Sequence, residues 1–541
     1  MTTIAPAAPS RNGTRPPAPA TRRRASGITV AAVLGAFIVA GIFAFIALDF
    51  TGVKLEKSLI SAQRFFARMV PLDFSEPDEL LRLTGVTLAI VISGTAVAAI
   101  LSVPVAYWAA RNTSPQPLLR WIGRGVTVLA RAFPELILII MLATMFSLGS
   151  LPGILAIGLH SVGMVGKLFA DAIEQIDEGP RTAIRAAGGT KLQEFAAGIL
   201  PQVAPSWIAT VLHRNDINLR GSAILGYVGM PGLGYELSAS IQRLDYKRAI
   251  AVAIILFLLC VAMELISMGI RRMVLRRGKV SSTSPSAWQR VRSPLVGWTA
   301  AAAVIASAIV AQPAWGDFLT VWSVLPQRIA AFFPLSTGDY TWPQVFTMLW
   351  DTVAIALAGT LIGVVLSGIV GSFAARNVAP SGAVHAVSRL VLLVVRGIPE
   401  LILAIVLILV TGLGGSAAAL ALGIGTVGLL GKLLADSIEE VDPGPERALS
   451  AVGATRPQVY FSATLPQAAP AIVGHAFYAL DGNVRAATVL AVVGAGGVGQ
   501  AMFTAAQLSK YNVVATFALL VIGVVLAIEA IAAFLRRLLA Q

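Results

Sequence analysis

The residues of this 541-residue chain that could do chemistry are charged and amide side chains placed inside long apolar stretches. A charged side chain at the centre of a bilayer costs at least about 2.5–3.5 kcal/mol, so one that is retained there usually has a partner or faces a water-filled path. The deepest of these residues form a triplet that occurs twice: Asp216, Asn218 and Arg220, then Asp481, Asn483 and Arg485. A guanidinium in a path suits an oxyanion, because its planar fork matches phosphate oxygens.

Two roles stay open for the triplets. Their members are spaced by two, so they cannot all pair along one helix face, and they either line a path between helices or brace one helix against another. Other charges lie four residues apart, which puts both on one helix face and predicts internal ion pairs. These pairs are Arg131 with Glu135, Lys167 with Asp171, Arg396 with Glu400, and Lys432 with Asp436.

Several chemistries are excluded by the same inspection. The one cysteine, Cys260, lies in an apolar stretch and the four histidines are scattered, so we expect neither a disulfide nor a metal site. The glycines at 229–234 lack the strand and helix of a dinucleotide site, and residues 163–168 lack the spacing and hydroxyl of a Walker A loop. We expect no bound cofactor and no enzyme activity, and any ATP hydrolysis would belong to another chain.

Composition places these residues in a lipid bilayer. The chain is 56% hydrophobic and 13% charged, whereas soluble domains carry roughly 25% charged residues, and its mean hydropathy is +0.80. Apolar runs of about 20 residues are long enough to cross a bilayer and predict an all-α polytopic membrane protein. Twelve spans are expected, near 28–49, 84–110, 125–147, 152–171, 204–229, 247–270, 296–314, 349–375, 390–411, 415–436, 469–494 and 512–535.

The spans form two copies of one module. Residues 131–138 (Arg-Ala-Phe-Pro-Glu-Leu-Ile-Leu) return 265 residues later at 396–403 as Arg-Gly-Ile-Pro-Glu-Leu-Ile-Leu. Six spans per module is an even number, so both copies have the same orientation and form a parallel repeat about an axis along the membrane normal. We therefore predict a disordered cytoplasmic tail (1–27), a first module (28–275), a cytoplasmic linker (276–293) and a second module (294–541).

The net charge of +14 indicates how the chain is oriented across the membrane. No basic patch lies in a soluble segment, which argues against a nucleic-acid partner. Basic residues at 22–24, 271–279 and 536–537 precede the first span or follow the sixth and the twelfth. By the positive-inside rule these segments face the cytoplasm. The protein is thus predicted to be a multi-pass protein of the plasma or inner membrane with both termini cytoplasmic.

Each module carries a polar segment between its fourth and fifth spans, at residues 178–202 and 443–467, which we call the loop segments. In each, a glycine breaks the preceding helix, a short helix follows, and a Leu-Pro pair begins the next span. The residues that define this pattern, and that are predicted to form the functional surface of the loop segments, are Gly188, Lys191, Phe195, Leu200 and Pro201 in the first segment, and Gly453, Arg456, Tyr460, Leu465 and Pro466 in the second.

The loop segments resemble the cytoplasmic coupling loop of ABC-importer permeases, a motif with Glu-Ala-Ala, a glycine and a distal Leu-Pro. Thr182 and Arg447 stand where that family usually has Glu, so coupling would rest on the short helices that follow. The fifth span, from Asn218 to the glycines at 229–234, resembles the phosphonate-type branch of these permeases.

The resemblance implies a type I ABC importer permease fold with two modules fused in one chain. It further implies two identical ATPase subunits at the loop segments, an extracytoplasmic substrate-binding protein, and transport of phosphonate or a related oxyanion such as phosphate or phosphite. One alternative is a permease for a different small solute. Another is a self-sufficient secondary carrier, which predicts a Gly-x-x-x-Asp-Arg loop after the second span, where this chain has Arg111-Asn-Thr-Ser-Pro.

Overall fold

A computed structural model of the chain describes residues 27–49, 60, 63, 67–146, 148–275, 287–412 and 414–540. Within these ranges the regular structure is helical and contains no strand. The predicted tail lies outside the described residues except for its last residue, and so does most of the predicted linker, at 276–286.

The first half of the chain contains ten described helices. They are α1 (Gly27–Ala47), α3 (Pro77–Ala109), α4 (Pro117–Ala132), α5 (Glu135–Met145), α6 (Ser150–Glu174), α7 (Glu178–Ala186), α8 (Lys191–Gln193), α9 (Leu200–Tyr227), α10 (Leu233–Gln242) and α11 (Tyr246–Leu275). A π-helical turn, Glu194–Ile199, joins α8 to α9.

The second half repeats this order. Its described helices are α12 (Ala287–Ala311), α13 (Asp317–Ala330), α14 (Trp342–Ala374), α15 (Gly382–Gly397), α16 (Glu400–Thr411), α17 (Gly415–Glu439), α18 (Pro443–Ala451), α19 (Arg456–Val459), α20 (Leu465–Leu490), α21 (Gly497–Gln507) and α22 (Tyr511–Ala540). A π-helical turn, Tyr460–Thr464, again precedes the fifth span of the module.

The predicted all-helical membrane fold is confirmed, although the count of twelve spans is not reached. Nine of the described helices are long and apolar enough to cross a bilayer, and the number is eleven if each of two bent helix pairs is one span. The span predicted at 296–314 corresponds to α12, whose apolar part, Gly297–Ala311, is shorter than a full crossing.

The third span of each half is broken, so the continuous helices predicted at 125–147 and 390–411 are wrong. α4 and α5 meet at 93°, and α15 and α16 meet at 86°. Pro134 and Pro399 occupy the breaks, as the residues that cap α5 and α16. Proline has no N–H to donate and its ring disfavours a helical conformation in the preceding residue, so each span turns at this point.

Glycines bring the second and fourth spans of each half into close contact. A Cβ atom on Gly94 of α3 would lie 2.8 Å from Ile157 of α6, and one on Gly359 of α14 would lie 2.9 Å from Leu422 of α17. Small residues allow helix backbones to approach closely in lipid, where van der Waals packing replaces the hydrophobic effect. The same pair of helices therefore forms the centre of both bundles.

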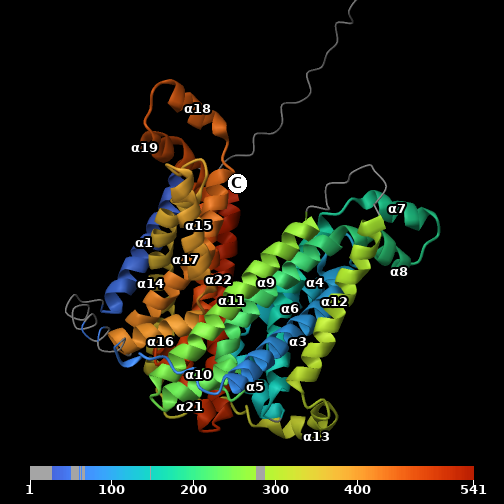
Figure 1. Ribbon diagram of the computed structural model, residues 1–541, viewed down its shortest axis with the longest axis vertical. Coiled ribbons are helices and arrows are strands. Elements are labelled where there is room, and N and C mark those ends of the chain that lie inside the picture. The colour runs from blue at the N-terminus through green and yellow to red at the C-terminus, as the bar shows by residue number, and fades with distance from the viewer. Residues whose placement is uncertain are drawn as a thin grey trace, which may run out of the picture.

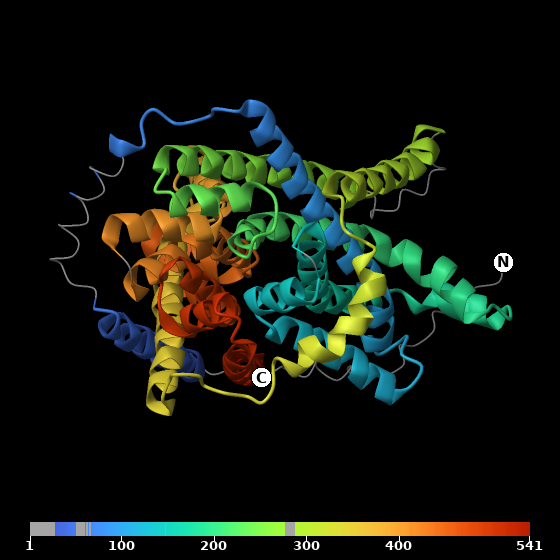
Figure 2. The same cartoon turned by 90° about the horizontal axis from the view of Figure 1, so that it is seen from below.

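The first helix of each half packs on the other half. α1 lies along α14, where Phe43 and Trp350 have ring centroids 6.0 Å apart (Figure 2). α12 lies along α3, where the Oγ atoms of Ser93 and Ser307 are 2.9 Å apart (Figure 1). Each bundle in space therefore takes its outer helix from the other repeat of the sequence.

This exchange predicts a covalent cross-link between the halves. In a Cys260→Ala background, Ser93→Cys with Ser307→Cys should form a disulfide under mild oxidation, because the two hydroxyls are in direct contact. After cleavage at a protease site placed in residues 276–286, the oxidised double variant should stay one band on non-reducing gels. Each single variant should separate into two fragments, and separation of the oxidised double variant would contradict the exchange.

Candidate translocation path and loop segments

A cavity of about 300 Å³ lies between the two halves, and we call it the central cavity. α9 and α20 supply its arginines, Arg220 and Arg485, while α5 and α16 supply Glu135 and Glu400. Each half thus contributes one guanidinium and one carboxylate at equivalent positions of the repeat. Further polar lining comes from His160, His213, Arg396, Thr426, Tyr478 and Asn483.

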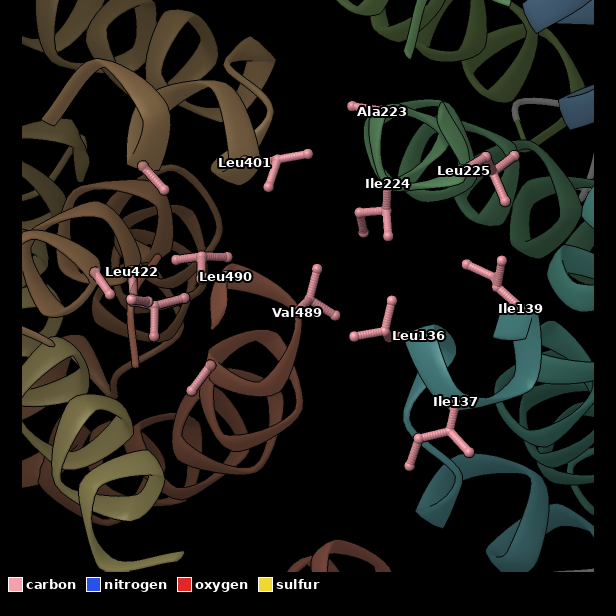
Figure 3. Close-up of a cluster of buried hydrophobic side chains, with 14 of the residues drawn as sticks. Leu136, Ile137, Ile139, Ala223, Ile224, Leu225, Leu401, Leu422, Val489 and Leu490 are labelled. Atoms are coloured by element: carbon pink, nitrogen blue, oxygen red, sulfur yellow. The ribbon is translucent and has the colours of Figure 1, made fainter. Parts of the chain in front are cut away.

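Apolar side chains line the central cavity on the side away from the loop segments. Ile224 and Val489 each follow a cavity arginine by four residues, or about 6 Å along the helix. Figure 3 shows these two side chains and Leu136 between the ribbons of the two halves. We call Leu136, Ile224, Leu401, Val489 and Leu490 the apolar seal. The two arginines therefore lie directly on the loop-segment side of a hydrophobic layer.

Two further cavities continue from the central cavity toward the loop segments. The first vestibule, of about 670 Å³, shares His160, Tyr478 and Arg485 with the central cavity, and the second, of about 530 Å³, shares Arg396. Cations outnumber carboxylates in both. The first is lined by Arg131, Lys167, Arg214 and Arg485 against Asp481 and Glu529, and the second by Arg272, Arg376, Arg389, Arg396 and Lys432 against Glu264 and Glu439.

The cavity arginines bind the backbone of the opposite half. Arg220 donates from Nη1 to the carbonyl oxygen of Arg396 at 2.7 Å, and Arg485 donates to that of Arg131 at 3.4 Å. Both acceptors lie in the last turn of the helix that precedes the break in the third span, namely α4 or α15. Carbonyl groups in a last turn lack the usual helical N–H partner. The breaks at the prolines thus create acceptors that side chains of the other half satisfy.

Two ion pairs join the halves at the same places, and we call them the inter-half clasps. Arg131 at the end of α4 binds Glu529 of α22 at 2.6 Å, and Arg396 at the end of α15 binds Glu264 of α11 at 3.2 Å. The predicted pairs of Arg131 with Glu135 and of Arg396 with Glu400 are therefore wrong. The helix turns between the two members of each pair, so spacing by four no longer places them on one face.

The amides of the triplets brace helices within their own half. Asn218 donates to Thr95 at 2.9 Å and accepts from Ser161 at 3.1 Å. Asn483 makes the equivalent bonds, to Thr360 at 2.8 Å and from Thr426 at 3.1 Å. Both amides are buried. The structure supports bracing for both asparagines, and Asn483 in addition lines the central cavity.

The acidic residues of the triplets take different roles. Asp216 accepts from Ser267 of α11 at 2.7 Å, whereas Asp481 lines the first vestibule and binds Arg485 at 2.9 Å. The predicted pairs on the fourth spans are also revised. Asp436 binds Arg389 of α15 at 3.1 Å instead of Lys432. Lys167 acts on Asp171 electrostatically, and both lysines line vestibules.

The local structure predicted for the loop segments is confirmed. Gly188 and Gly453 end the preceding helices with φ of +80° and +85°, a left-handed conformation that favours glycine. Thr190 and Thr455 cap the short helices that follow, and their backbone N–H groups each donate to a Gln side chain at 2.8 Å. Leu200-Pro201 and Leu465-Pro466 begin α9 and α20.

The aromatic residues predicted for the coupling surface point inward. The Phe195 ring packs edge-on against Tyr107 of α3 at 5.8 Å, and the Tyr460 hydroxyl hydrogen-bonds to Ser372 of α14 at 2.7 Å. These rings hold the loop segments to their own bundles. The outward surface is formed instead by apolar side chains that sequence reasoning missed: Leu192 (76% exposed), Val452 (81%) and Phe461 (65%), beside the exposed Lys191 and Arg456.

A buried carboxylate that sequence reasoning missed stabilises the first loop segment. Glu194 is 2% exposed and accepts from both Arg181 and Arg185 of α7. Its hydrogen bond to Arg185 raises the pKa of that guanidinium. In the second segment Glu446 stands where the repeat has Arg181, and it accepts from Thr464. Glu194 and Glu446 can be identified only from contacts between separate helices, because neither charge recurs at the equivalent position of the other half.

The repeated Ala-Ala-Arg-Asn sequence also has a structural role that was missed. Asn112 donates to the Ile173 carbonyl at 2.8 Å and Asn377 to the Ile438 carbonyl at 2.9 Å, at the ends of α6 and α17. Each asparagine also reaches a glutamate of its loop segment, Glu178 or Glu446. The exact repetition of this tetrapeptide, at residues 109–112 and 374–377, was the sequence signal that could have revealed this role. It fastens the loop segments to the spans.

Two helical bundles that exchange their first helices, enclose a cation-lined cavity and carry paired loop segments define a two-module transport protein of the membrane. Residues 102–277 and 367–541 each match the family described as "binding-protein-dependent transport system inner membrane component". The chain belongs to this family and carries its domain twice. It is a multi-pass permease subunit of an ABC importer, whose ATPase and substrate-binding protein are separate subunits.

Two relatives show how far the similarity extends. The chain is 37% identical over 500 residues to the phosphate-import permease protein PhnE of Mycolicibacterium smegmatis, an alignment that covers 91% of each chain. It is 41% identical over 203 residues to the phosphite transport system permease protein PtxC of Stutzerimonas stutzeri, which covers 38% of this chain and 74% of that one.

The first inter-half clasp predicts a measurable coupling between residues far apart in sequence. In a double-mutant cycle of Arg131→Gln and Glu529→Gln, the unfolding free energies should show a coupling of about 1–3 kcal/mol, because the pair is largely shielded from water. The exposed pair Arg82–Glu79, also at 2.6 Å, is the matched control and should couple by only about 0.2–1 kcal/mol. Equal coupling in the two cycles would contradict the clasp.

Proposed function

We propose that the chain imports a small phosphorus oxyanion, of the phosphate, phosphite or phosphonate class. The observation that carries this proposal is the pair Arg220 and Arg485, which face one cavity from opposite halves on the loop-segment side of the apolar seal. Guanidinium forks match phosphoryl oxygens. The names of the relatives, a phosphate-import and a phosphite permease, support the same class of substrate.

The vestibules support an anion path beyond the cavity. Once past the arginines, an anion would meet a surface with more cations than carboxylates in either vestibule. A cavity lined by one sign of charge raises the local concentration of the opposite ion. The direction of movement is then from the apolar seal toward the loop segments.

The proposed topology has both termini and both loop segments in the cytoplasm, with two parallel modules at residues 28–275 and 294–541. Two identical ATPase subunits would dock on the loop segments, one on each, and the binding protein on the opposite side. Leu192, Val452 and Phe461 offer apolar docking contacts there, since exposed apolar side chains outside the bilayer commonly mark an interface.

Alternating access would follow from rigid rocking of the two bundles. The loop segments lie far apart in Figure 1, while the opposite ends of the bundles lie together. ATP-driven closure of the ATPases would draw the loop segments together and part the apolar seal. The inter-half clasps and the arginine–carbonyl bonds lie between these two ends, and they would have to shift in each cycle.

The cavity arginines can be tested directly. Arg220→Gln with Arg485→Gln should lower phosphate uptake at least about tenfold in proteoliposomes that contain the ATPase and the binding protein, because each Gln lacks the charge and the fork. Lys at both positions should restore uptake only in part.

The matched control for this test is Arg120→Gln, an arginine of α4 that lies outside the cavities and the loop segments, which should leave uptake unchanged. Uptake is normalised to folded protein. A double Gln variant that transports normally, or that loses only folded protein, would end the assignment of the arginines to the path.

Coupling can be tested at the glycines of the loop segments. Gly188→Val with Gly453→Val should leave ATPase activity but abolish its link to uptake, since Val at a positive φ costs about 1–2 kcal/mol per site and displaces the short helices. Gly125→Val with Gly368→Val is the matched control, because those helical glycines also have open space around Cβ. Normal uptake in the Gly188/Gly453 variant would contradict the coupling role.

A further inference from the structure

The two halves differ in chemistry where the central cavity meets the first vestibule. The repeat keeps the cavity arginines, the cavity glutamates and the bracing asparagines in both halves. Three positions that line the central cavity or the first vestibule change: His160 corresponds to Gly425, His213 to Tyr478, and Arg214 to Ala479. His160, Arg214 and Tyr478 all line the first vestibule, so a pseudo-symmetric path becomes asymmetric there.

Arg214 is held rigidly with donors to spare. It is 7% exposed, donates from Nε to Ser161 at 2.8 Å, and has Nη1 3.7 Å from the sulfur of Met164. A guanidinium has five N–H donors, and these contacts use only two of them. The Glu135 carboxylate acts on Arg214 electrostatically, but among the described residues no carboxylate lies within 4.0 Å of it. Fixed, incompletely used donors of this kind suit an oxyanion.

His160 adds a polar atom that lacks a partner. Its Nδ1 is buried without a hydrogen-bond partner in the described structure. In a neutral imidazole one ring nitrogen donates and the other accepts, and the tautomer protonated at Nε2 leaves Nδ1 as an acceptor. A buried acceptor without a donor costs about 1–3 kcal/mol, a cost that a ligand hydroxyl would remove.

We propose that Arg214, Arg485 and His160 form a transit site that prefers phosphorus oxyanions carrying a P–OH group over sulfate. Both guanidiniums act on the His160 ring, which places the three groups around one space. The arginines bind anionic oxygens, and His160 Nδ1 accepts from the P–OH. Sulfate has no O–H at neutral pH, so it leaves Nδ1 unpaired. A site built around a substrate hydroxyl rejects an analogue that lacks it.

The second vestibule shows why the site is assigned to the first. His385 also has a buried Nδ1 without a hydrogen-bond partner among the described residues. There, however, Arg389 is paired with Asp436 and Glu439, and Arg396 with Glu264. Arg389 and Arg396 of the second vestibule are thus both paired with carboxylates, whereas in the first vestibule Arg485 is paired with Asp481 and Arg214 has no ion pair among the described residues. His385 therefore provides a matched control for His160.

The proposal rests on the proposed function and is tested by ligand binding to the full chain in nanodiscs without the binding protein. Radiolabelled inorganic phosphate is the probe and sulfate the competitor. The unaltered chain should prefer phosphate at least about tenfold. His160→Leu should remove this preference by weakening phosphate alone, and His160→Asn, which keeps an acceptor at the δ position, should restore it in part.

Arg214→Gln should weaken phosphate and sulfate alike by about tenfold or more, whereas His385→Leu should change neither. Equal loss of both anions in His160→Leu, an unchanged preference in that variant, or normal binding in Arg214→Gln would overturn the transit site. So would an unaltered chain that transports phosphate in proteoliposomes yet binds none in nanodiscs. Absence of transport of any phosphorus oxyanion would instead overturn the proposed function itself.

Discussion

The constraint on which the rest of this structure depends is that a backbone carbonyl inside a bilayer must find a donor. Proline breaks the third span of each half and frees carbonyls in the last turn of α4 and α15. Arginines of the opposite half supply the donors, and the arginines at those same turns bind glutamates across the interface. Contact between the halves is therefore polar around the central cavity and apolar at the apolar seal. The proline in each third span accounts both for the bend and for the position of the charged side chains around the cavity.

Comparison of the two repeats distinguishes structural features that both halves require from features that only one half requires. The loop segments, bracing amides and clasps occur in both halves, because two bundles must each be held together and each be moved. The residues that we propose to bind the transported anion need not be duplicated, because one small ion occupies one place at a time. Divergence between the repeats at His160 and Arg214 is informative for this reason. The same reasoning explains why Arg181 and Glu446 could exchange sign: both fasten a loop segment locally, and either charge can do so with a suitable neighbour.

Sequence reasoning recovered whatever depends on local chemistry or on repetition. The all-helical membrane fold, the presence of two modules, and the turn at Gly188 with its following short helix all depend on neighbouring residues and are as expected, whereas the count of twelve spans and the unbroken third spans are not. It failed where a partner comes from another helix. Arg131 and Glu135 satisfy the spacing rule for a helix face, yet the intervening proline removes that face and Glu529, almost 400 residues away, becomes the partner. Phe195 likewise looked available for docking, because its contact with Tyr107 appears only when α3 and the loop segment are placed together.

The exchange of first helices has a consequence for biogenesis. α1 leaves the ribosome early, but α14, the helix on which it packs, begins only at Trp342. At about 5–20 residues per second, translation leaves α1 in the lipid for roughly 15–60 s before its partner exists. During that time its exposed small and apolar surface can meet only lipid or another helix. α12, by contrast, emerges beside an α3 that is already inserted. The two bundles are thus completed in a fixed order, the bundle around α3 first, and α1, which is made before α3, is among the last helices to reach its place.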